Sequence, residues 1–394
     1  MTLFTREPLA HTPLSVEPGC RVEFGAGSVA RLPELIDSLG GRRAFVVTDR
    51  GLRAAGVADR ALKTLDAAGV PYTVYDEVAP NPSTGNVDAG AARARESRPD
   101  VVVALGGGSV LDAAKGISLL TGNPDAVAAD ADHLWEAADG LPLIAVPTTS
   151  GTGAETNGFG VIEDAVAHRK VYIGHPSVRP RIALLDPELT LGLPAPATAA
   201  TGIDALVHGI ESLASRGANP FSVAYATEAV TLVSRALPVA HRDGTDLEAR
   251  AELMMGAHLA GQALTLSGLG LVHGVAHALT AHTGTPHGVA LAAVLEEVLE
   301  YTAPAATAAY ERAARAMRVA PPADGDWARA CVTAVRDLSG ALDIKRPLRE
   351  LGTERAMLPS IAAGAVADAV TKNAPRQPTE ADVRDILERT YGGA

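Results

Sequence analysis

The sequence predicts two domains of different fold class: an α/β dinucleotide-binding domain with a parallel sheet and flanking helices over residues 1–190, and an all-helical domain over residues 191–394. The first half alternates short apolar runs with helical segments, which is typical of a parallel sheet covered by helices. After Pro194 and Pro196, periodic Ala, Leu and Val segments follow without a convincing strand. The length of 394 residues also exceeds what one hydrophobic core ordinarily serves.

Short apolar runs in the first half predict buried strands. The runs RAFVVT and DVVVAL are almost continuously apolar, as expected where helices cover both faces of a sheet. The predicted strands lie at residues 14–17, 21–24, 43–48, 72–75, 100–105, 141–146 and 182–185, and the helices between them at 57–68, 87–97 and 110–120.

Helical periodicity dominates the second half of the chain. The predicted helices lie at residues 197–215, 223–237, 247–266, 269–281, 289–301, 304–317, 327–342, 354–372 and 379–391.

Composition limits the possible partners and the compartment. With 20% charged and 47% hydrophobic residues the chain is typical of a soluble globular protein, and no apolar stretch is long enough to predict a membrane helix. A formal charge of −12 disfavours nucleic acid and anionic membrane surfaces as partners. Cys20 and Cys331 form no CxxC pair, and the N-terminus has no signal-peptide pattern, so we expect a cytoplasmic protein.

A glycine-rich turn after the predicted strand at 100–105 suggests an anion site. Gly107, Gly108 and Ser109 stand between this strand and the next predicted helix. Glycines at such a junction let backbone N–H groups approach an anion at the helix N-terminus, and a pyrophosphate is the expected ligand. The alternative is a tight turn without a ligand. The run does not match GxGxxG, so it predicts no standard Rossmann fingerprint.

A second polar loop follows the next predicted strand. Thr148, Thr149 and Thr152 lie in the run PTTSGTGAE, whose hydroxyl and amide groups could bind a phosphate or a sugar. A solvated polar loop is the alternative. Two such loops after two buried strands favour a ligand, because ligands gather beyond the carboxyl ends of parallel strands.

Three further residues of the first half are candidates for cofactor contacts. Asp49 ends the strand at 43–48, where a carboxylate can accept both ribose hydroxyls and repel a 2′-phosphate, which favours NAD over NADP. Its alternative role is a helix N-cap. Lys170 could neutralise a phosphate or could be an ordinary surface lysine. Asn81 lies between two prolines, and this local pattern alone predicts a rigid turn.

Two pairs of residues with a spacing of four in the second half predict a metal centre. Asp204 and His208 are four residues apart, as are His273 and His277, so each pair shares one helical face. His287 follows a Thr-Pro turn that would return the chain to the same place. A single histidine on an apolar face is more often a core residue, but the combined pattern favours one divalent metal. Nitrogen and oxygen donors without a thiolate suit Fe(II) or Zn(II).

Four motifs resemble those of the iron-containing (group III) alcohol dehydrogenases: GGGSVLDAAK, PTTSGTGAE, GIDALVHGIES and LVHGVAHALTAHTGTPHGVAL. The resemblance extends through nearly the whole chain. It implies an α/β nucleotide domain and a helical domain with the active site in the cleft, and a homodimer or higher homo-oligomer.

The resemblance also assigns site residues. The family's metal ligands fall on Asp204, His208, His273 and His287, and His277 is expected near the nicotinamide. The family's nucleotide contacts fall on Asp49, Asn81, Gly107, Gly108, Ser109, Thr148, Thr149, Thr152 and Lys170. Two segments depart from the family pattern: Gly153–Asn157 stands where relatives often read GSEVT, and Leu295-Glu296-Glu297 where they often read Leu-Pro-His.

The predicted function is reversible hydride transfer between NAD(P)(H) and a small alcohol or aldehyde, which could bear a carboxylate or a phosphonate. The metal would polarise the substrate oxygen. His277 would relay a proton or orient the cofactor, with a packing role as its alternative. Three other functions compete: a metal-independent reductase of the maleylacetate type, a lyase related to dehydroquinate synthase with a similar two-domain architecture, and a non-catalytic nucleotide-binding module.

Overall fold

The computed structural model describes residues 16, 19–164 and 169–392, and its internal contacts divide the chain into two compact units. The α/β unit comprises Cys20–Thr198 and Arg242–Gly261. The helical unit contains Ala199–His241 and the chain from Gln262 onward.

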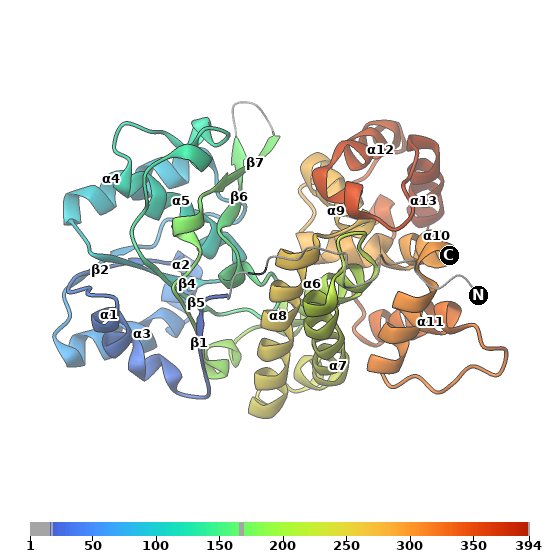
Figure 1. Ribbon diagram of the computed structural model, residues 1–394, viewed down its shortest axis with the longest axis horizontal. Coiled ribbons are helices and arrows are strands. Elements are labelled where there is room, and N and C mark those ends of the chain that lie inside the picture. Colours follow the sequence, from blue (N-terminus) through green and yellow to red (C-terminus); the bar gives the residue numbers. More distant parts are fainter. Residues whose placement is uncertain (1–15, 17–18, 165–168, 393–394) are drawn as a thin grey trace. The chain divides into compact units, whose positions relative to one another are not determined.

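A six-stranded sheet forms the centre of the α/β unit (Figure 1), with the strand order β1-β8-β5-β4-β2-β3. All neighbouring strands are parallel, so their carboxyl ends meet at one edge. The strands are β1 (Arg21–Phe24), β2 (Ala44–Val47), β3 (Tyr72–Tyr75), β4 (Val101–Gly106), β5 (Leu143–Pro147) and β8 (Ile182–Leu185). They confirm the parallel sheet and correspond to the predicted runs from residue 21 onward. The run predicted at 14–17 lies almost entirely outside the described residues.

Helices cover both faces of this sheet because its strands are apolar on both sides. In β2, Ala44 and Val46 pack with α1 (Leu32–Ser38) and α3 (Val57–Ala68). Phe45 and Val47, which point the other way, pack in the core of α4 (Thr84–Ser97) and α5 (Gly108–Gly122). The short helix α2 (Arg50–Ala54) follows β2 directly. After β2 the chain adds β3 on one side of β2, and then adds β4 on its other side. The direction in which strands are added therefore reverses between β2 and β4, and open α/β sheets bind ligands at such a point.

A two-stranded antiparallel ribbon, β6 (Phe159–Asp164) and β7 (Arg169–Gly174), was not predicted from the sequence. It packs on α5 through Gly160, where a Cβ atom would lie 2.6 Å from the Asp112 carbonyl oxygen. Lys115 of α5 is fully buried and donates to Asn157 Oδ1 at 2.8 Å and to the Phe159 carbonyl at 2.6 Å. The ribbon is therefore anchored on α5 and forms a sheet of its own.

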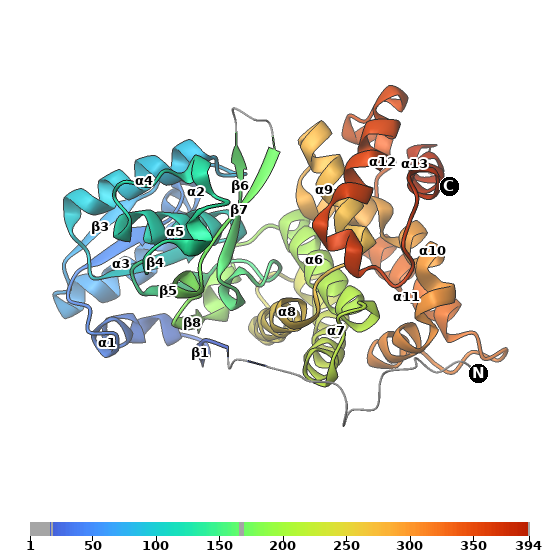
Figure 2. The same ribbon diagram turned by 45° about the horizontal axis from the view of Figure 1, so that its top comes forward.

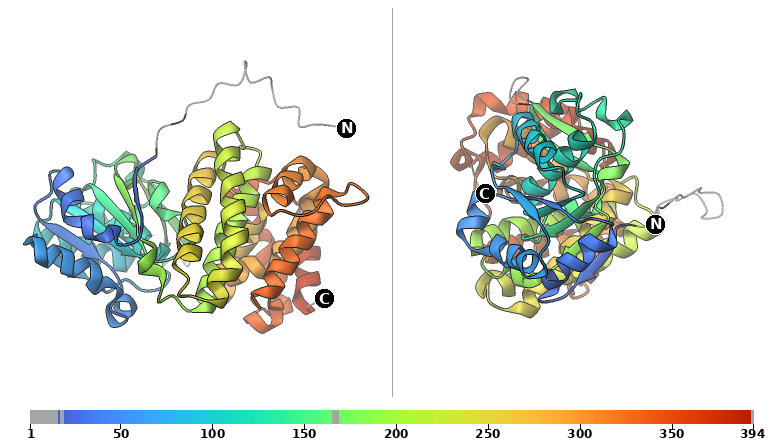
Figure 3. Two further views of the ribbon diagram at one scale, coloured as in Figure 1. Left: turned by 90° about the horizontal axis from the view of Figure 1, so that it is seen from below. Right: turned by 90° about the vertical axis from the view of Figure 1, so that its left-hand side faces the viewer.

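The helical unit is built from long helices whose glycines allow close packing. α7 runs alongside α6 (Figures 1 and 3), and a Cβ at Gly202 of α6 would lie 2.3 Å from Leu237 of α7. α10 packs against α9 and α11, and α12 against α9 and α13 (Figure 2). The helices are α6 (Ala195–Ala214), α7 (Pro220–Arg242), α8 (Leu247–Ser267), α9 (Leu271–Thr283), α10 (His287–Ala316), α11 (Trp327–Ala341), α12 (Leu358–Ala367) and α13 (Glu380–Gly392).

Three of the predicted helical segments differ in extent from the helices of the structure. The helix predicted at 354–372 is instead α12 flanked by 3₁₀ turns. Asp368, between α12 and the second turn, η10 (Ala369–Asn373), has extended backbone angles and ends α12. The helices predicted at 289–301 and 304–317 are joined as α10, which contains Pro304 and a non-helical kink at Ala306.

The first turns of α8 belong to the α/β unit. Met254 packs with Ala183 and Leu185 of β8, and Gly261 meets Gly153 so closely that a Cβ on either would clash. Within the described residues no single helix has both the length and the apolar character to cross a membrane, and α8 with α9 reaches that threshold only as a pair bent by 101°.

The buried amine of Lys115 gives a stability prediction. Lys115→Met should lower the free energy of unfolding by about 3–5 kcal/mol, because it leaves Asn157 Oδ1, the Phe159 carbonyl and Asp112 without their cation. Urea unfolding with a probe in the α/β unit measures this change. Lys63→Met removes an exposed lysine from α3 and should change stability by no more than about 0.5 kcal/mol. Equal midpoints for the two variants would contradict the structural role of Lys115.

Candidate active site

Helix α6 carries the first two predicted metal ligands on one buried face. Asp204 and His208 are one helical turn apart and are 3% and 4% exposed. His208 Nε2 lies 3.2 Å from Asp204 Oδ1. Pro196 stands in the first turn of α6, where its missing N–H costs no helical hydrogen bond. The predicted i, i+4 pair is therefore directed to a single point.

Helices α9 and α10 bring two further imidazoles to the same carboxylate oxygen. His273 Nε2 lies 3.5 Å and His287 Nε2 3.6 Å from Asp204 Oδ1. The rings of His208 and His273 stack with centroids 4.7 Å apart. Donor atoms of Asp204, His208 and His273 all lie within 4.8 Å of one another, and His287, whose side chain is 35% exposed, lies beside this compact group.

The first residues of α10 sit directly on the backbone of α6. At Gly288, a Cβ atom would lie 2.2 Å from the Ala200 carbonyl oxygen. Glycine at this position therefore allows the start of α10, with His287 as its first residue, to approach Asp204. The Thr-Pro turn before His287 ends α9 and starts α10, as predicted.

The environment of these donors favours a cation. Within the part of the chain that the structure describes, Asp204 Oδ1 and His273 Nε2 are buried without a hydrogen-bond partner. Burial would raise the pKa of Asp204, but the imidazoles of His208, His273 and His287 hold it well below its usual value. Burial lowers the pKa of His208 to about 4, so its ring is neutral at neutral pH and keeps a lone pair. Orphaned buried donors of this kind fit a divalent metal.

The carboxyl edge of the sheet holds the predicted nucleotide loops together. Gly107 is the N-cap of α5, and a Cβ on it would lie 3.2 Å from Thr149, while a Cβ on Gly108 would lie 2.6 Å from Thr152. The Thr148 N–H donates to the Gly106 carbonyl at 3.0 Å. The glycine turn after β4 and the threonine loop after β5 are thus in contact, and Ser109 lies in the first turn of α5.

The other candidate cofactor residues have the following positions. Asp49 is the N-cap of α2, and its Oδ1 accepts from the Leu52 N–H at 2.9 Å, so the alternative capping role is present. Asn81 has a φ of 54°, consistent with a rigid turn. Lys170 is on β7, with Nζ 3.8 Å from Glu163 Oε2, and burial lowers its pKa.

Comparison with known proteins identifies the family. The family profile "Iron-containing alcohol dehydrogenase" matches residues 19–187, and "Fe-containing alcohol dehydrogenase family, C-terminal" matches residues 198–391. The chain belongs to the iron-containing alcohol dehydrogenase family. The predicted resemblance, fold class and type of activity are confirmed, and the protein is an oxidoreductase that acts on CH–OH groups.

Individual relatives cover nearly the whole chain. Lactaldehyde reductase of Escherichia coli (strain K12) is 35% identical over 374 residues, which are 93% of this chain and 97% of the relative. The crystal structure of a 1,3-propanediol oxidoreductase has a TM-score of 0.90 at 32% identity and covers 94% of this chain and 98% of its own. Sulfoacetaldehyde reductase from Bifidobacterium kashiwanohense, solved with NAD+, has a TM-score of 0.88 at 27% identity and covers 97% of this chain and 100% of its own. Membership of the family implies a metal and a nicotinamide cofactor.

Two carboxylates of this family member were missed by sequence reasoning. Glu211 Oε2 lies 2.7 Å from His273 Nδ1, and both Glu211 oxygens also accept backbone N–H groups, of Gly270 at 2.9 Å and Val272 at 2.7 Å. One side chain therefore fixes the His273 ring and the N-terminus of α9. Glu211 is three residues after His208 on α6, a spacing that could have drawn attention to it.

The second missed carboxylate is Asp368, whose Oδ2 lies 2.9 Å from His277 Nδ1. The His277 ring lies beside the metal donors, with its centroid 5.4 Å from that of His287 and 5.9 Å from that of His273. His282, by contrast, lies in the last turn of α9 and donates from Nδ1 to the Ala278 carbonyl at 2.8 Å.

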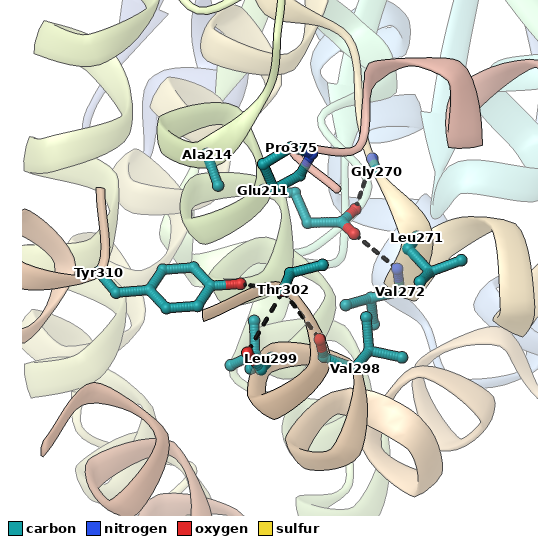
Figure 4. Close-up of a pocket in the computed structure, with 10 residues that line it drawn as sticks. All are labelled: Glu211, Ala214, Gly270, Leu271, Val272, Val298, Leu299, Thr302, Tyr310 and Pro375. Carbon is teal, nitrogen blue, oxygen red and sulfur yellow. Dashed lines mark hydrogen bonds between the residues drawn. The ribbon is translucent and has the colours of Figure 1, made fainter. Parts of the chain in front are cut away.

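A small cavity lies behind Glu211 (Figure 4). Its volume is about 10 Å³, and its lining includes Thr302 and Tyr310, whose hydroxyls are 2.6 Å apart. Such a volume holds roughly one water molecule and excludes any alcohol or aldehyde. The cavity is therefore too small to be a substrate pocket.

The contacts of Glu211 predict an effect on metal retention. Glu211→Gln should weaken metal binding about 10–100-fold. The two carboxylate oxygens of Glu211 accept hydrogen bonds from Gly270, Val272 and His273, whereas glutamine has only one acceptor oxygen. Competition between the metal-free protein and a chromophoric chelator measures this affinity. Glu228→Gln makes the same change at an exposed site on α7 and should leave affinity unchanged. Equal affinities in the two variants would show that Glu211 does not support the metal site.

Proposed function

We propose that this protein is an NAD(H)-dependent, metal-dependent alcohol dehydrogenase and aldehyde reductase, with the metal held by Asp204, His208, His273 and His287. The observation that supports it most is the buried donor group of Asp204, His208 and His273, two of whose donor atoms are unpaired, in a chain of the iron-containing alcohol dehydrogenase family. We infer Fe(II) as the metal, because the family is iron-containing. Zn(II) is the alternative, because three imidazoles and one carboxylate suit both metals.

The bound metal would act as a Lewis acid that stabilises negative charge on the substrate oxygen during hydride transfer. The chain's own residues prepare this chemistry. His208 is kept neutral by burial, and Glu211 fixes the orientation of the His273 ring. His277 is the candidate for moving a proton or orienting the nicotinamide, since its ring lies against His273 and His287.

The α/β unit would bind the cofactor at the carboxyl edge of its sheet. The N-terminus of α5 and the contacting threonine loop offer backbone N–H and hydroxyl groups to a pyrophosphate. We infer that Gly107, Gly108, Ser109, Thr148, Thr149 and Thr152 surround it, with Asp49, Asn81 and Lys170 at the rest of the nucleotide. Function would then divide near residue 190, with the nucleotide before it and the metal after it.

The substrate is proposed to be a small aldehyde or alcohol. The relatives named above act on a neutral hydroxyaldehyde, a diol and a sulfonated aldehyde, so both neutral and acidic compounds belong in the search. The homo-oligomer and the cytoplasmic location inferred from the sequence stay predictions.

An aldehyde screen tests the proposal. Protein loaded anaerobically with Fe(II) or Zn(II) should oxidise NADH with at least one member of a panel containing propanal, lactaldehyde and aldehydes that bear a carboxylate, sulfonate or phosphonate. Absorbance of NADH gives the rate, and elemental analysis gives the metal. His273→Ala should lose both metal and turnover, whereas His282→Ala, on the same helix, should retain both.

Two outcomes would reject parts of this proposal. Turnover that survives in metal-free His273→Ala would instead favour the metal-independent reductase chemistry considered above. Absence of NADH oxidation across the whole panel, with metal bound, would reject the dehydrogenase assignment.

Asp49 makes a separate prediction for cofactor choice. Asp49→Gly should raise the ratio of kcat/KM with NADP to that with NAD at least about tenfold, because a carboxylate beside a 2′-phosphate costs several kcal/mol. Glycine is nearly as good an N-cap as aspartate, and Asp49→Asn keeps the cap on Leu52 while removing the charge. Both variants should therefore shift the ratio. An unchanged ratio in both would leave Asp49 as a helix cap only.

A further inference from the structure

We propose that Asp368 is a positioning residue for His277: its carboxylate fixes the ring orientation and the tautomer that expose Nε2 for the reaction. This inference rests on the proposed function, because His277 is a candidate catalytic residue only if the protein transfers hydride at the neighbouring metal site. It assigns a role to a residue that lies 91 positions from its partner in the sequence.

The contact between the two side chains has the geometry of a charge-assisted hydrogen bond. His277 Nδ1 and Asp368 Oδ2 are 2.9 Å apart, and the two side chains are 26% and 17% exposed. Burial would raise the pKa of Asp368, but the hydrogen bond from His277, the charge interactions with His277 and His273 and the hydrogen bond from the Val370 N–H together lower this pKa. Asp368 is then an acceptor only, so His277 Nδ1 must carry the proton of this bond.

A proton fixed on Nδ1 decides what the other ring nitrogen can do. In the neutral ring Nε2 then has the lone pair, so it can accept a proton or a hydrogen bond and cannot donate one. The same ring is placed by its neighbours: it stacks on His287 at an angle of 24° and meets His273 edge-on at 71°. A carboxylate that holds an imidazole in one tautomer is a known requirement of proton-transferring sites.

The chain around Asp368 is built to keep the carboxylate in place. Asp368 caps the turn η10, because its Oδ1 accepts from the Val370 N–H at 3.0 Å while Oδ2 remains for His277. Thr371 in the same turn is buried and donates to the Ala365 carbonyl at 2.7 Å. It packs on α9 at Gly274, where a Cβ atom would lie 2.0 Å from the Thr371 hydroxyl oxygen. The turn thus lies directly on the helix that carries His277.

This arrangement separates two functions of one carboxylate, and the separation can be tested. Asp368→Asn keeps the cap on Val370, because asparagine is an equally good capping residue, but removes the negative charge next to His277. Asp368→Ala removes both. Asp326→Ala is the matched control for loss of a cap in the same unit, since Asp326 Oδ1 accepts from the Arg329 N–H at 2.9 Å at the start of α11.

The first measurement is the tautomer of His277 by ¹⁵N NMR of the histidine rings in the zinc-loaded full-length protein, with the signal assigned by its loss in His277→Ala. The wild type should show a protonated Nδ1 and an unprotonated Nε2, and Asp368→Ala should shift this signal toward a mixture of tautomers. The Asp326→Ala variant should leave it unchanged. A wild-type ring protonated at Nε2 and bare at Nδ1 would overturn the proposal.

The second measurement is kinetic. Asp368→Asn should lower kcat about 10–100-fold with little change in KM and with full metal content, because substrate binding and the metal ligands are untouched. In the His277→Ala background the same substitution should cost nothing further, since the two residues act as one unit. An equal loss with and without His277 would overturn the proposal in favour of a purely structural Asp368. If the wild type shows no turnover with any aldehyde, the proposed function fails, whereas the NMR result still decides the pairing of Asp368 with His277.

Discussion

The burial of the Asp204 carboxylate is the constraint around which the helical unit is organised. An ionised carboxylate that is 3% exposed is costly unless charge or hydrogen bonds compensate it. In this structure the compensation comes from three imidazoles on three helices, which all approach one oxygen at 3.2–3.6 Å. We propose a divalent cation between these groups, because it would satisfy the buried donor atoms that have no hydrogen-bond partner. The close contact of α10 with α6 at Gly288 follows from this requirement, since only such an approach brings His287 to Asp204.

Two histidines of the site, His273 and His277, are in turn oriented by carboxylates from other parts of the chain. Glu211 binds His273 through Nδ1 and caps α9, and Asp368 binds His277 through Nδ1 and caps η10. In both cases one carboxylate caps the N-terminus of a helix or turn and also orients an imidazole. Any shift of that helix or turn therefore moves the ring as well. Ring orientation is thereby tied to the packing of whole helices, which is stiffer than a side chain held by rotamer preference alone.

Local patterns in the sequence were sufficient for the elements and for the residues that share a helical face. The apolar runs predicted the six parallel strands, and the i, i+4 spacing placed Asp204 with His208 and His273 with His277. Contacts between distant segments could not be predicted, because one sequence has no signal that connects residues 62 or 91 positions apart, as for Glu211 with His273 and Asp368 with His277. The β6–β7 ribbon was missed because its stability depends on the buried Lys115 of α5 as well as on its own alternation.

The carboxylates in the two segments that depart from the family pattern are paired within the fold. In Gly153–Asn157 the glutamate of GSEVT is kept as Glu155, which is buried, and its Oε1 lies 3.0 Å from His258 Nδ1 on α8. Glu296 and Glu297, which replace Pro-His, bind Lys345 Nζ at 2.9 and 3.0 Å, and Glu296 also pairs with Arg336 of α11. Each of these three carboxylates therefore has a cationic or imidazole partner on another segment of its own unit. Since Lys345 and Arg336 neutralise the new charges of Glu296 and Glu297 locally, this departure gives no reason to expect an altered metal ligand set.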